Sequence, residues 1–330
     1  MPRVPVSVGL FPIEPPRRMV ALAQLAEELG FSCAWVGDSQ MIWREAYVVL
    51  GAMAQATTRI ELATGVTNPV TRHSAVTAAA METLHELTGG RVRLGIGLGD
   101  SSVETLGARP ARLGDLEAAV RDIRALIAGE TIDPGAVPLR LTYASPGARV
   151  PAYLAVSGPR IHRLAGRLGD GAIILVGVDT SFLEASRTEL EHGAAEVGRD
   201  LKADGFKTVC WTPCSIAEDG HQARVAVKAH VARVLKRDLP FPLSPKDMAI
   251  VHEIRSRYEY YEHMVVGTAH GDIVPDELVE KFAVAGTPAE AREQMERLAA
   301  TGLVDEIAII PHAHDPADRE RILRIVAETL

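Results

Sequence analysis

Short apolar runs alternate with longer amphipathic segments along most of the chain, and this alternation limits the possible folds more than any other feature. Most of the apolar runs are continuous, as in AIILV and EIAII, which is typical of parallel strands covered on both faces. We expect eight strands, at Val4–Leu10, Cys33–Val36, Ile60–Gly65, Val92–Ile96, Ala152–Val156, Ala172–Val176, Thr208–Ile216 and Leu303–Ile310.

The segments between these runs have the spacing of amphipathic helices. Apolar residues recur at helical spacing over Met19–Leu29, after a Pro-Pro pair and before Gly30. Another pattern begins at Thr287-Pro288 and ends at Gly302, with the residue types that favour a helix start and stop. Eight alternations of strand and helix predict an α/β fold, the (β/α)8 TIM barrel.

The chain has 330 residues, and a minimal barrel needs about 250. We therefore expect one domain, residues 1–330, with three insertions. Asp100–Arg112 follows strand four, Gly129–Val150 precedes strand five and Arg237–Gly286 precedes strand eight. The first and third lie where loops leave the carboxyl ends of strands, so they can shape a substrate site.

Charge and composition exclude several classes of partner. Lys and Arg number 35 against 43 Asp and Glu, a net charge of −8, so we expect no nucleic-acid partner. No uninterrupted apolar run approaches the roughly 18 residues of a membrane helix, and no signal peptide pattern begins the chain. The three cysteines, Cys33, Cys210 and Cys214, suit buried free thiols, so we expect a cytoplasmic protein.

Three segments that follow predicted strands contain glycine or small polar residues. In GIGLGD, which begins at Gly95, Asp100 replaces the third glycine of a dinucleotide-binding motif, so that interpretation fails. These glycines allow either close strand packing or the approach of a flat ligand to the backbone. TGVTNPVTRH, which begins at Thr64, is either an ordinary loop or part of a catalytic face. Ser157–Arg160 opens a helix and is either an ordinary helix start or a phosphate cradle.

Together these segments resemble the bacterial luciferase-like superfamily of flavin- and deazaflavin-dependent barrel oxidoreductases. Within it, the chain is most similar to the coenzyme F420-dependent methylenetetrahydromethanopterin reductases and their actinobacterial relatives. The resemblance runs from about Val6 to the carboxyl terminus. It is carried by PIEPPRRMVALAQLAEELGF, TGVTNPVTRH, ELTGGRVRLGIGLGD, SGPRIHRLAGRLGDGAI, CSIAEDG and AVAGTPAEA.

The resemblance implies a cofactor with a flat three-ring head at the carboxyl-terminal mouth of the barrel. It also implies a non-prolyl cis peptide bond at Gly65–Val66, which forms a bulge behind the ring. Asp38 matches an acidic position near the ring and is the candidate catalytic residue. The other matched cofactor-binding positions are Thr67 beside the bulge, Leu98 and Gly99 after strand four, Ser157, Gly158 and Arg160 on the phosphate side, and Gly177 and Val178 after strand six.

Several residues keep more than one interpretation. Trp43 and His73 are candidates for the substrate pocket, although Trp43 could equally be packing and His73 could make only local hydrogen bonds. His312 and His314 resemble part of a metal site, but no partner motif stands elsewhere, so we expect no metal. The archaeal reductase has a glutamate on strand one where this chain has Gly9, which leaves the small-molecule substrate open.

The cofactor also keeps an alternative. Coenzyme F420 passes hydride, whereas FMN can activate oxygen for monooxygenation. The motifs favour F420, and Leu98 stands where FMN enzymes of the superfamily can place an arginine for phosphate. The alternatives are an FMN-dependent luciferase-like monooxygenase and a non-catalytic flavin-binding barrel. The resemblance and the small-residue runs VLGAMAQAT and AVTAAAMETL also predict a homodimer through the second and third helices.

Overall fold

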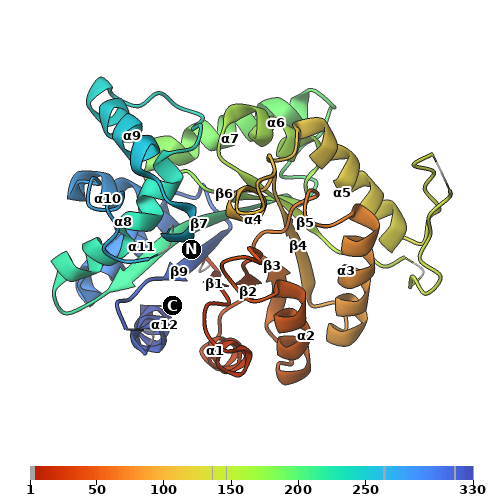
Figure 1. Cartoon of the computed structure of the whole chain (residues 1–330), viewed down its shortest axis with the longest axis horizontal. Helices are drawn as coiled ribbons and strands as arrows, with labels where there is room; N and C mark the ends of the chain where they lie inside the picture. Colours follow the sequence, from red (N-terminus) through yellow and green to blue (C-terminus); the bar gives the residue numbers. More distant parts are fainter. Residues whose placement is uncertain (1–3, 136, 146, 263–264, 316, 330) are drawn as a thin grey trace.

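The computed structural model describes residues 4–135, 137–145, 147–262, 265–315 and 317–329. Within these residues, eight parallel strands close into a barrel surrounded by helices (Figure 1), which confirms the predicted TIM barrel. Each barrel strand pairs with its neighbours in one direction, for example Val8 with Ala34 and Val6 with Ile307. The strands are β1 (Val6–Leu10), β2 (Cys33–Val36), β3 (Glu61–Thr64), β4 (Val92–Ile96), β5 (Ala152–Val156), β6 (Gly171–Ile174), β7 (Lys207–Ile216) and β9 (Glu306–Pro311).

A ninth strand, β8 (Val284–Gly286), was not predicted. The first residues of β7 pair with β6, and Cys214–Ile216 at its end pair with β8 along the same edge. The structure also shortens β6, which was expected to reach Val176 and ends at Ile174. Gly177 has a φ of +105°, and the next residue, Val178, donates its N–H to the Lys281 carbonyl and not to a barrel strand. β8 pairs with β7 beyond the point where β6 ends. This pairing joins distant segments of the chain, and a run of three residues is too short to predict it.

The helices begin and end close to the predicted positions. Pro16 opens α1, and the Thr287 side chain accepts from the backbone of Glu290 at the start of α11. The helices are α1 (Pro16–Glu28), α2 (Ala46–Ala56), α3 (Ser74–Thr88), α4 (Ser101–Glu104), α5 (Leu113–Ile127), α6 (Pro159–Leu168), α7 (Thr180–Ala195), α8 (Gly220–Leu235), α9 (Pro245–Arg257), α10 (Asp276–Phe282), α11 (Pro288–Ala300) and α12 (Asp318–Thr329), with the 3₁₀ turn η1 (Tyr260–Glu262). The part of the chain described here contains no helix long and apolar enough to cross a membrane.

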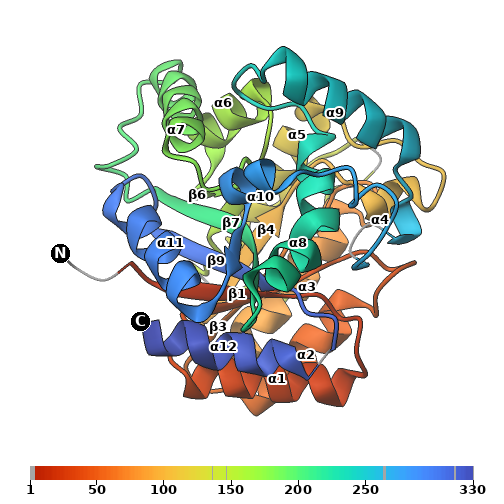
Figure 2. The same cartoon turned by 90° about the vertical axis from the view of Figure 1, so that its left-hand side faces the viewer.

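The three predicted insertions differ in character. In the insertion after β4 the chain forms a short helix, α4. Before β5 the chain makes a long excursion, visible as an extended loop in Figure 1, in which Ile132 and Leu139 form an antiparallel bridge. Before β8 the chain forms α9, η1 and α10. At the other side of the molecule, α1 and α12 pack together (Figure 2), and Arg319 pairs with Glu14 at 2.8 Å.

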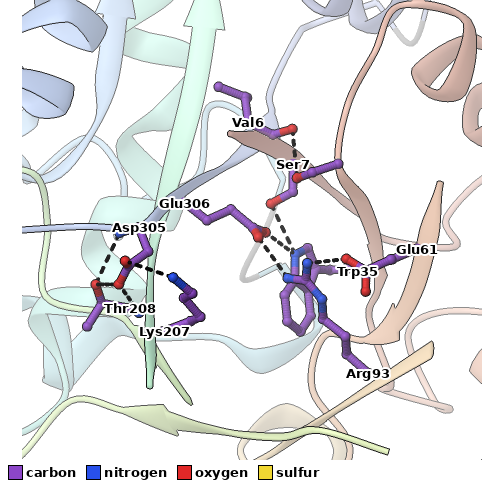
Figure 3. A network of polar contacts seen from close by, with 10 residues as sticks. Val6, Ser7, Trp35, Glu61, Arg93, Lys207, Thr208, Asp305 and Glu306 are labelled. Carbon is purple, nitrogen blue, oxygen red and sulfur yellow. Dashed lines mark hydrogen bonds and ion pairs between the residues drawn. The ribbon is translucent and has the colours of Figure 1, made fainter. Parts of the chain in front are cut away.

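The amino-terminal end of the barrel holds a polar network around the Trp35 ring (Figure 3). Arg93 on β4 forms ion pairs with Glu61 and, at 2.7 Å, with Glu306. Trp35 Nε1 donates to Ser7 Oγ at 3.1 Å and to Glu306 Oε1 at 3.3 Å. This network and the packed rings of Trp35, Tyr153 and Trp211 fill part of the barrel interior, and the large cavity lies toward the carboxyl ends of the strands. The three cysteines are buried free thiols, as predicted.

Candidate functional site

A cavity of about 1340 Å³ opens at the carboxyl ends of the strands. Its walls come from the segments after β1 to β6, from β7, and from the chain between α8 and η1. Parallel strands end together at this face, so residues far apart in sequence meet there. The predicted residues that line the cavity are Asp38, Trp43, Gly65, Val66, Leu98, Gly99, Ser157, Gly158 and Arg160.

The floor of the cavity is formed where β3 and β4 end. The peptide bond between Gly65 and Val66 is cis, as the family resemblance implied. A Cβ on Gly65 would lie 2.9 Å from Trp35 Cβ and 3.0 Å from Trp211 Cη2, closer than normal packing allows. Gly97 also lines the cavity, and a Cβ there would lie 3.3 Å from Val66 Cγ2. The floor therefore has no side chain at these two positions, so a flat molecule can approach the backbone.

One carboxyl group lies at the edge of this floor. Asp38 follows β2 and is only 7% exposed, although it lines the cavity. Thr67 Oγ1 donates to Asp38 Oδ2 at 2.9 Å. Burial raises the pKa of the Asp38 carboxyl, while the hydrogen bond from Thr67 lowers it and so opposes part of the rise. This environment favours a carboxyl that can hold a proton at a higher pH than an exposed aspartate.

Aromatic rings form a neighbouring wall. Phe11 stacks on Trp43, with ring centroids 4.4 Å apart and planes 16° from parallel. Trp211 on β7 is tilted against Phe11 at 6.3 Å. The three rings come from three different segments and all line the cavity. They offer an apolar surface of the kind that covers a flat organic ligand and displaces water from it.

The start of α6 forms another part of the cavity. Pro159 opens the helix, and Ser157, Gly158 and Arg160 line the cavity around its first residues. Gly158 lies against the chain after α8, because a Cβ there would be 3.3 Å from Asp238 Cβ. His162 holds this loop from below: its Nδ1 lies 2.7 Å from the Gly158 carbonyl and its Nε2 3.0 Å from Ser186 Oγ. Backbone N–H groups at a helix start and a nearby Arg suit an anion.

A group of cations that sequence reasoning missed lies at the end of α8. Arg233, Lys236 and Arg237 all line the cavity and surround Asp100, the residue that precedes α4. The sequence carried a sign of this group, since the three cations are spaced to share one helix face. Only the fold, however, brings that face to the loop after β4.

Four predicted residues do not line the cavity. Thr67 is fully buried and donates its hydrogen bond to Asp38, which does line the cavity. His73 precedes α3, where its Nδ1 accepts from the backbone of Ala75 at 3.2 Å. Gly177 and Val178 turn toward α10, and the Val178 N–H donates to the Lys281 carbonyl at 2.8 Å.

The described residues contain no group of three His, Cys, Asp or Glu side chains placed to hold a metal ion. His312, one of the two histidines considered for that role, is buried and its Nε2 lies 2.9 Å from His230 Nδ1. Burial lowers the pKa of His312 to about 3, so this imidazole is neutral.

A parallel barrel with a glycine-floored cavity at the carboxyl ends of its strands is the architecture of a barrel enzyme. The model of the luciferase-like monooxygenase family matches residues 3–305. The chain therefore belongs to that family.

Curated relatives are similar over much of the chain. The 5,10-methylenetetrahydromethanopterin reductase of Archaeoglobus fulgidus is 30% identical over 88% of this chain and 89% of its own length. The F420-dependent glucose-6-phosphate dehydrogenase of Beutenbergia cavernae is 39% identical over 56% of this chain and 61% of its own length.

Two solved structures show the same fold. The coenzyme F420-dependent tetrahydromethanopterin reductase of Methanopyrus kandleri has a TM-score of 0.77 and 24% identity, over 99% of this chain and 98% of that chain. A second structure is the oxygenating constituent of 3,6-diketocamphane monooxygenase from Pseudomonas putida, in complex with FMN. It has a TM-score of 0.66 and 18% identity, over 99% of this chain and 97% of that chain.

Proposed function

We propose that this protein is a coenzyme F420-dependent oxidoreductase that transfers a hydride between the deazaflavin and an electrophilic carbon of a small organic substrate. The observation that carries the proposal is the glycine floor of the cavity, with the buried Asp38 carboxyl beside it. The Beutenbergia dehydrogenase and the Methanopyrus reductase named above support the choice of F420, because both of their names state that cofactor. We further propose that residues 1–330 act as one domain.

The residues present fit a cofactor with a flat head and an anionic arm. Side chains at Gly65 and Gly97 would remove the flat floor. Ser157, Gly158 and Arg160 would hold the phosphate, since they combine a helix start with a cation. When bound, coenzyme F420 supplies a hydride donor or acceptor that does not activate oxygen.

The chain's own residues would then orient the reactants and manage a proton. The wall of Phe11, Trp43 and Trp211 would exclude water from above the floor. Holding two reactants in attack geometry can contribute about 7–11 kcal/mol to catalysis. Asp38 is the candidate for holding or moving the proton that accompanies hydride transfer, because burial raises its pKa.

FMN-dependent monooxygenation is the second candidate function, favoured by the shared fold of the FMN-bound structure. Leu98 lines the cavity after β4 and supplies no cation there, which argues against that candidate. A flavin-binding barrel without catalysis is a third candidate. The Asp38 carboxyl, buried beside the floor, argues against it, since a barrel that only binds a ring has no need of an acid group there.

Titration of the purified protein with F420 and with FMN, followed by absorbance and fluorescence, tests the proposal. We expect F420 to bind at least about tenfold more tightly than FMN, a difference of about 1.4 kcal/mol. Tight FMN binding without F420 binding would contradict the F420 proposal and favour the two flavin candidates, of which only the monooxygenase would consume oxygen. Binding of neither compound would contradict all three candidates.

We also propose a cytoplasmic homodimer that uses no nucleic-acid partner. Three buried free thiols suit a reducing compartment, and a net charge of −8 disfavours phosphate backbones. The packed helices α2 and α3 carry the exposed apolar residues Val48, 69% exposed, and Val76, 51% exposed. A second copy covering this face would remove both from water.

A further inference from the structure

Three cations lie in and just after the last turn of α8, which ends at Leu235. Arg233, Lys236 and Arg237 are spaced so that they lie on one face of the helix end, where the helix dipole favours positive charge. Their side chains are only 14%, 12% and 19% exposed, yet all three line the cavity. This group, here called the α8 cation cluster, is therefore directed inward and not toward bulk solvent.

Two carboxylates face the cluster. Asp100 lies 3.2 Å from Arg233 Nε and 3.3 Å from Lys236 Nζ, and it also pairs with Arg237. Glu104 lies 3.9 Å from Lys236 Nζ. The ion pairs among the described residues thus join these three cations to two carboxylates. Burial lowers the pKa of Lys236, and Arg237 adds to the lowering, so a further negative charge would stabilise the ammonium.

The cavity as a whole differs in charge from the protein. The chain has a net charge of −8, but six cations line the cavity: Arg112, Arg160, Arg233, Lys236, Arg237 and Arg255. Four carboxylates line it, those of Asp38, Asp100, Glu104 and Asp238. Of these, Asp38 lies at the floor, and the side chain of Asp238 is 93% exposed. Positive charge therefore predominates in the cavity of an otherwise acidic protein, and this charge attracts anions.

The cluster is also held in place. The Nη1 of Arg233 lies 3.4 Å from His230 Nε2, and a guanidinium can only donate, so Nε2 accepts. The His230 proton is then on Nδ1 and is donated to His312 Nε2 at 2.9 Å. Lys236 lies over the ring of Tyr258 at 4.2 Å. These contacts fix the cations before any ligand arrives, which reduces the entropy lost on binding.

We propose that the α8 cation cluster is an anion-binding subsite for a phosphate or carboxylate group of a ligand in this cavity. In the protein without ligand, the Asp100 carboxylate competes with that anion for the three cations. The anion could belong to the arm of the cofactor or to the substrate. The proposal deepens the proposed function, because it assigns an anionic group to one of the two ligands. The clearest consequence is that removing a cation and removing Asp100 should have opposite effects.

Calorimetry with inorganic phosphate tests the subsite without any cofactor. We expect Lys236→Met to weaken phosphate binding about tenfold or more, since a charge-assisted bond is lost. We expect Asp100→Asn to tighten phosphate binding. Lys202→Met, which removes an exposed cation outside the cavity, should leave it unchanged. Circular dichroism checks that each variant is folded, and Arg237→Met replaces Lys236→Met if that variant is not.

Two further titrations identify the source of the anion. Coenzyme F420 is compared with its deazaflavin head lacking the phosphate arm, using the parent and Lys236→Met. Weaker binding of F420 but not of the head assigns the anion to the cofactor. Unchanged F420 binding, with phosphate binding lost from the F420-loaded variant, assigns it to the substrate.

Three results would overturn the subsite. These are no phosphate binding by the parent, equal phosphate affinity in Lys236→Met and the parent, or weakening by both Lys236→Met and Asp100→Asn. The last result would show that the ion pairs only support the fold. Failure of the parent to bind F420 would contradict the proposed function, but the phosphate titrations would still decide the subsite.

Discussion

The Thr67 hydroxyl donates a 2.9 Å hydrogen bond to Asp38 Oδ2 and so joins the loop after β3 to the end of β2. It opposes the effect of burial, which raises the pKa of the carboxyl. The folded protein therefore binds the Asp38 proton more tightly than the unfolded chain does. By linkage, this group lowers the free energy of unfolding as the pH rises from the ordinary aspartate pKa through the raised one.

Asp38→Asn should remove this decrease and raise the free energy of unfolding at neutral pH relative to the parent. Thr67→Val should move the decrease to higher pH, because it deletes the bond that favours the carboxylate. Urea unfolding across the acidic and neutral range measures both effects. Asp133→Asn, at an exposed loop, is the control and should unfold like the parent. Identical pH dependence in all four proteins would mean that Asp38 titrates as an exposed carboxyl.

Gly65→Ala should destabilise the protein by about 1–3 kcal/mol, the usual cost of overpacking. The added Cβ would lie within 3.0 Å of both Trp35 and Trp211. It should also weaken F420 binding, since those rings or the floor must shift. Gly114→Ala is the matched control, because a Cβ there meets nothing within 4 Å. Urea unfolding and cofactor titration measure the two effects, and full retention of both by Gly65→Ala would refute the assigned floor.

Arg93→Met should reduce the free energy of unfolding by about 3–5 kcal/mol, because it leaves Glu306 buried without its cation. Trp35 Nε1 would still donate to Glu306, but one donor cannot replace a guanidinium. Denaturant unfolding measures the loss. Arg121→Met provides the comparison, since Arg121 pairs with Glu117 on the surface and should change stability by less than about 1 kcal/mol. Equal effects of the two substitutions would exclude a stabilising role for the Arg93 network.

Two buried histidines should lower the free energy of unfolding as the pH falls from about 6.5 toward 4, in the direction opposite to Asp38. Burial lowers the pKa of His162 to about 4 and that of His312 to about 3, so the unfolded chain takes up these protons first. His162→Gln should flatten part of this decrease, although it is less stable at neutral pH because the bonds to Gly158 and Ser186 change. Urea unfolding at several pH values measures the slopes. A slope that is the same in His162→Gln and the parent would contradict the neutral, buried assignment.

Val48→Lys together with Val76→Lys should convert the proposed homodimer to a monomer, because each places a charge on the exposed apolar face of α2 and α3. Sedimentation velocity at micromolar concentration reports the change. Val197→Lys is the control, since Val197 is 53% exposed and follows α7. A monomeric parent would rule out the dimer, and a dimeric double variant would place its interface elsewhere.

Local patterns in the sequence determined most of the barrel. Continuous apolar runs located all eight barrel strands to within a few residues, because strands buried on both faces need apolar side chains at every position. Pro16 and the Thr287 cap set helix starts through contacts within a few residues. The family motifs similarly placed Asp38, Gly65 and Ser157 at strand ends, where a barrel gathers its loops.

Only the tertiary structure decided which distant groups meet. β6 pairs only with the first residues of β7, so the end of β7 is free to pair with β8. A strand of three residues is too short for its sequence periodicity to predict this pairing. Val178 likewise donates its N–H to the Lys281 carbonyl and does not line the cavity. Asp100 faces Arg237 across 137 positions of sequence. Such contacts depend on how the insertions fold over the carboxyl-terminal end of the barrel. The burial of these residues and the ion pair of Asp100 with Arg237 therefore exist only when the closed barrel brings the distant segments together.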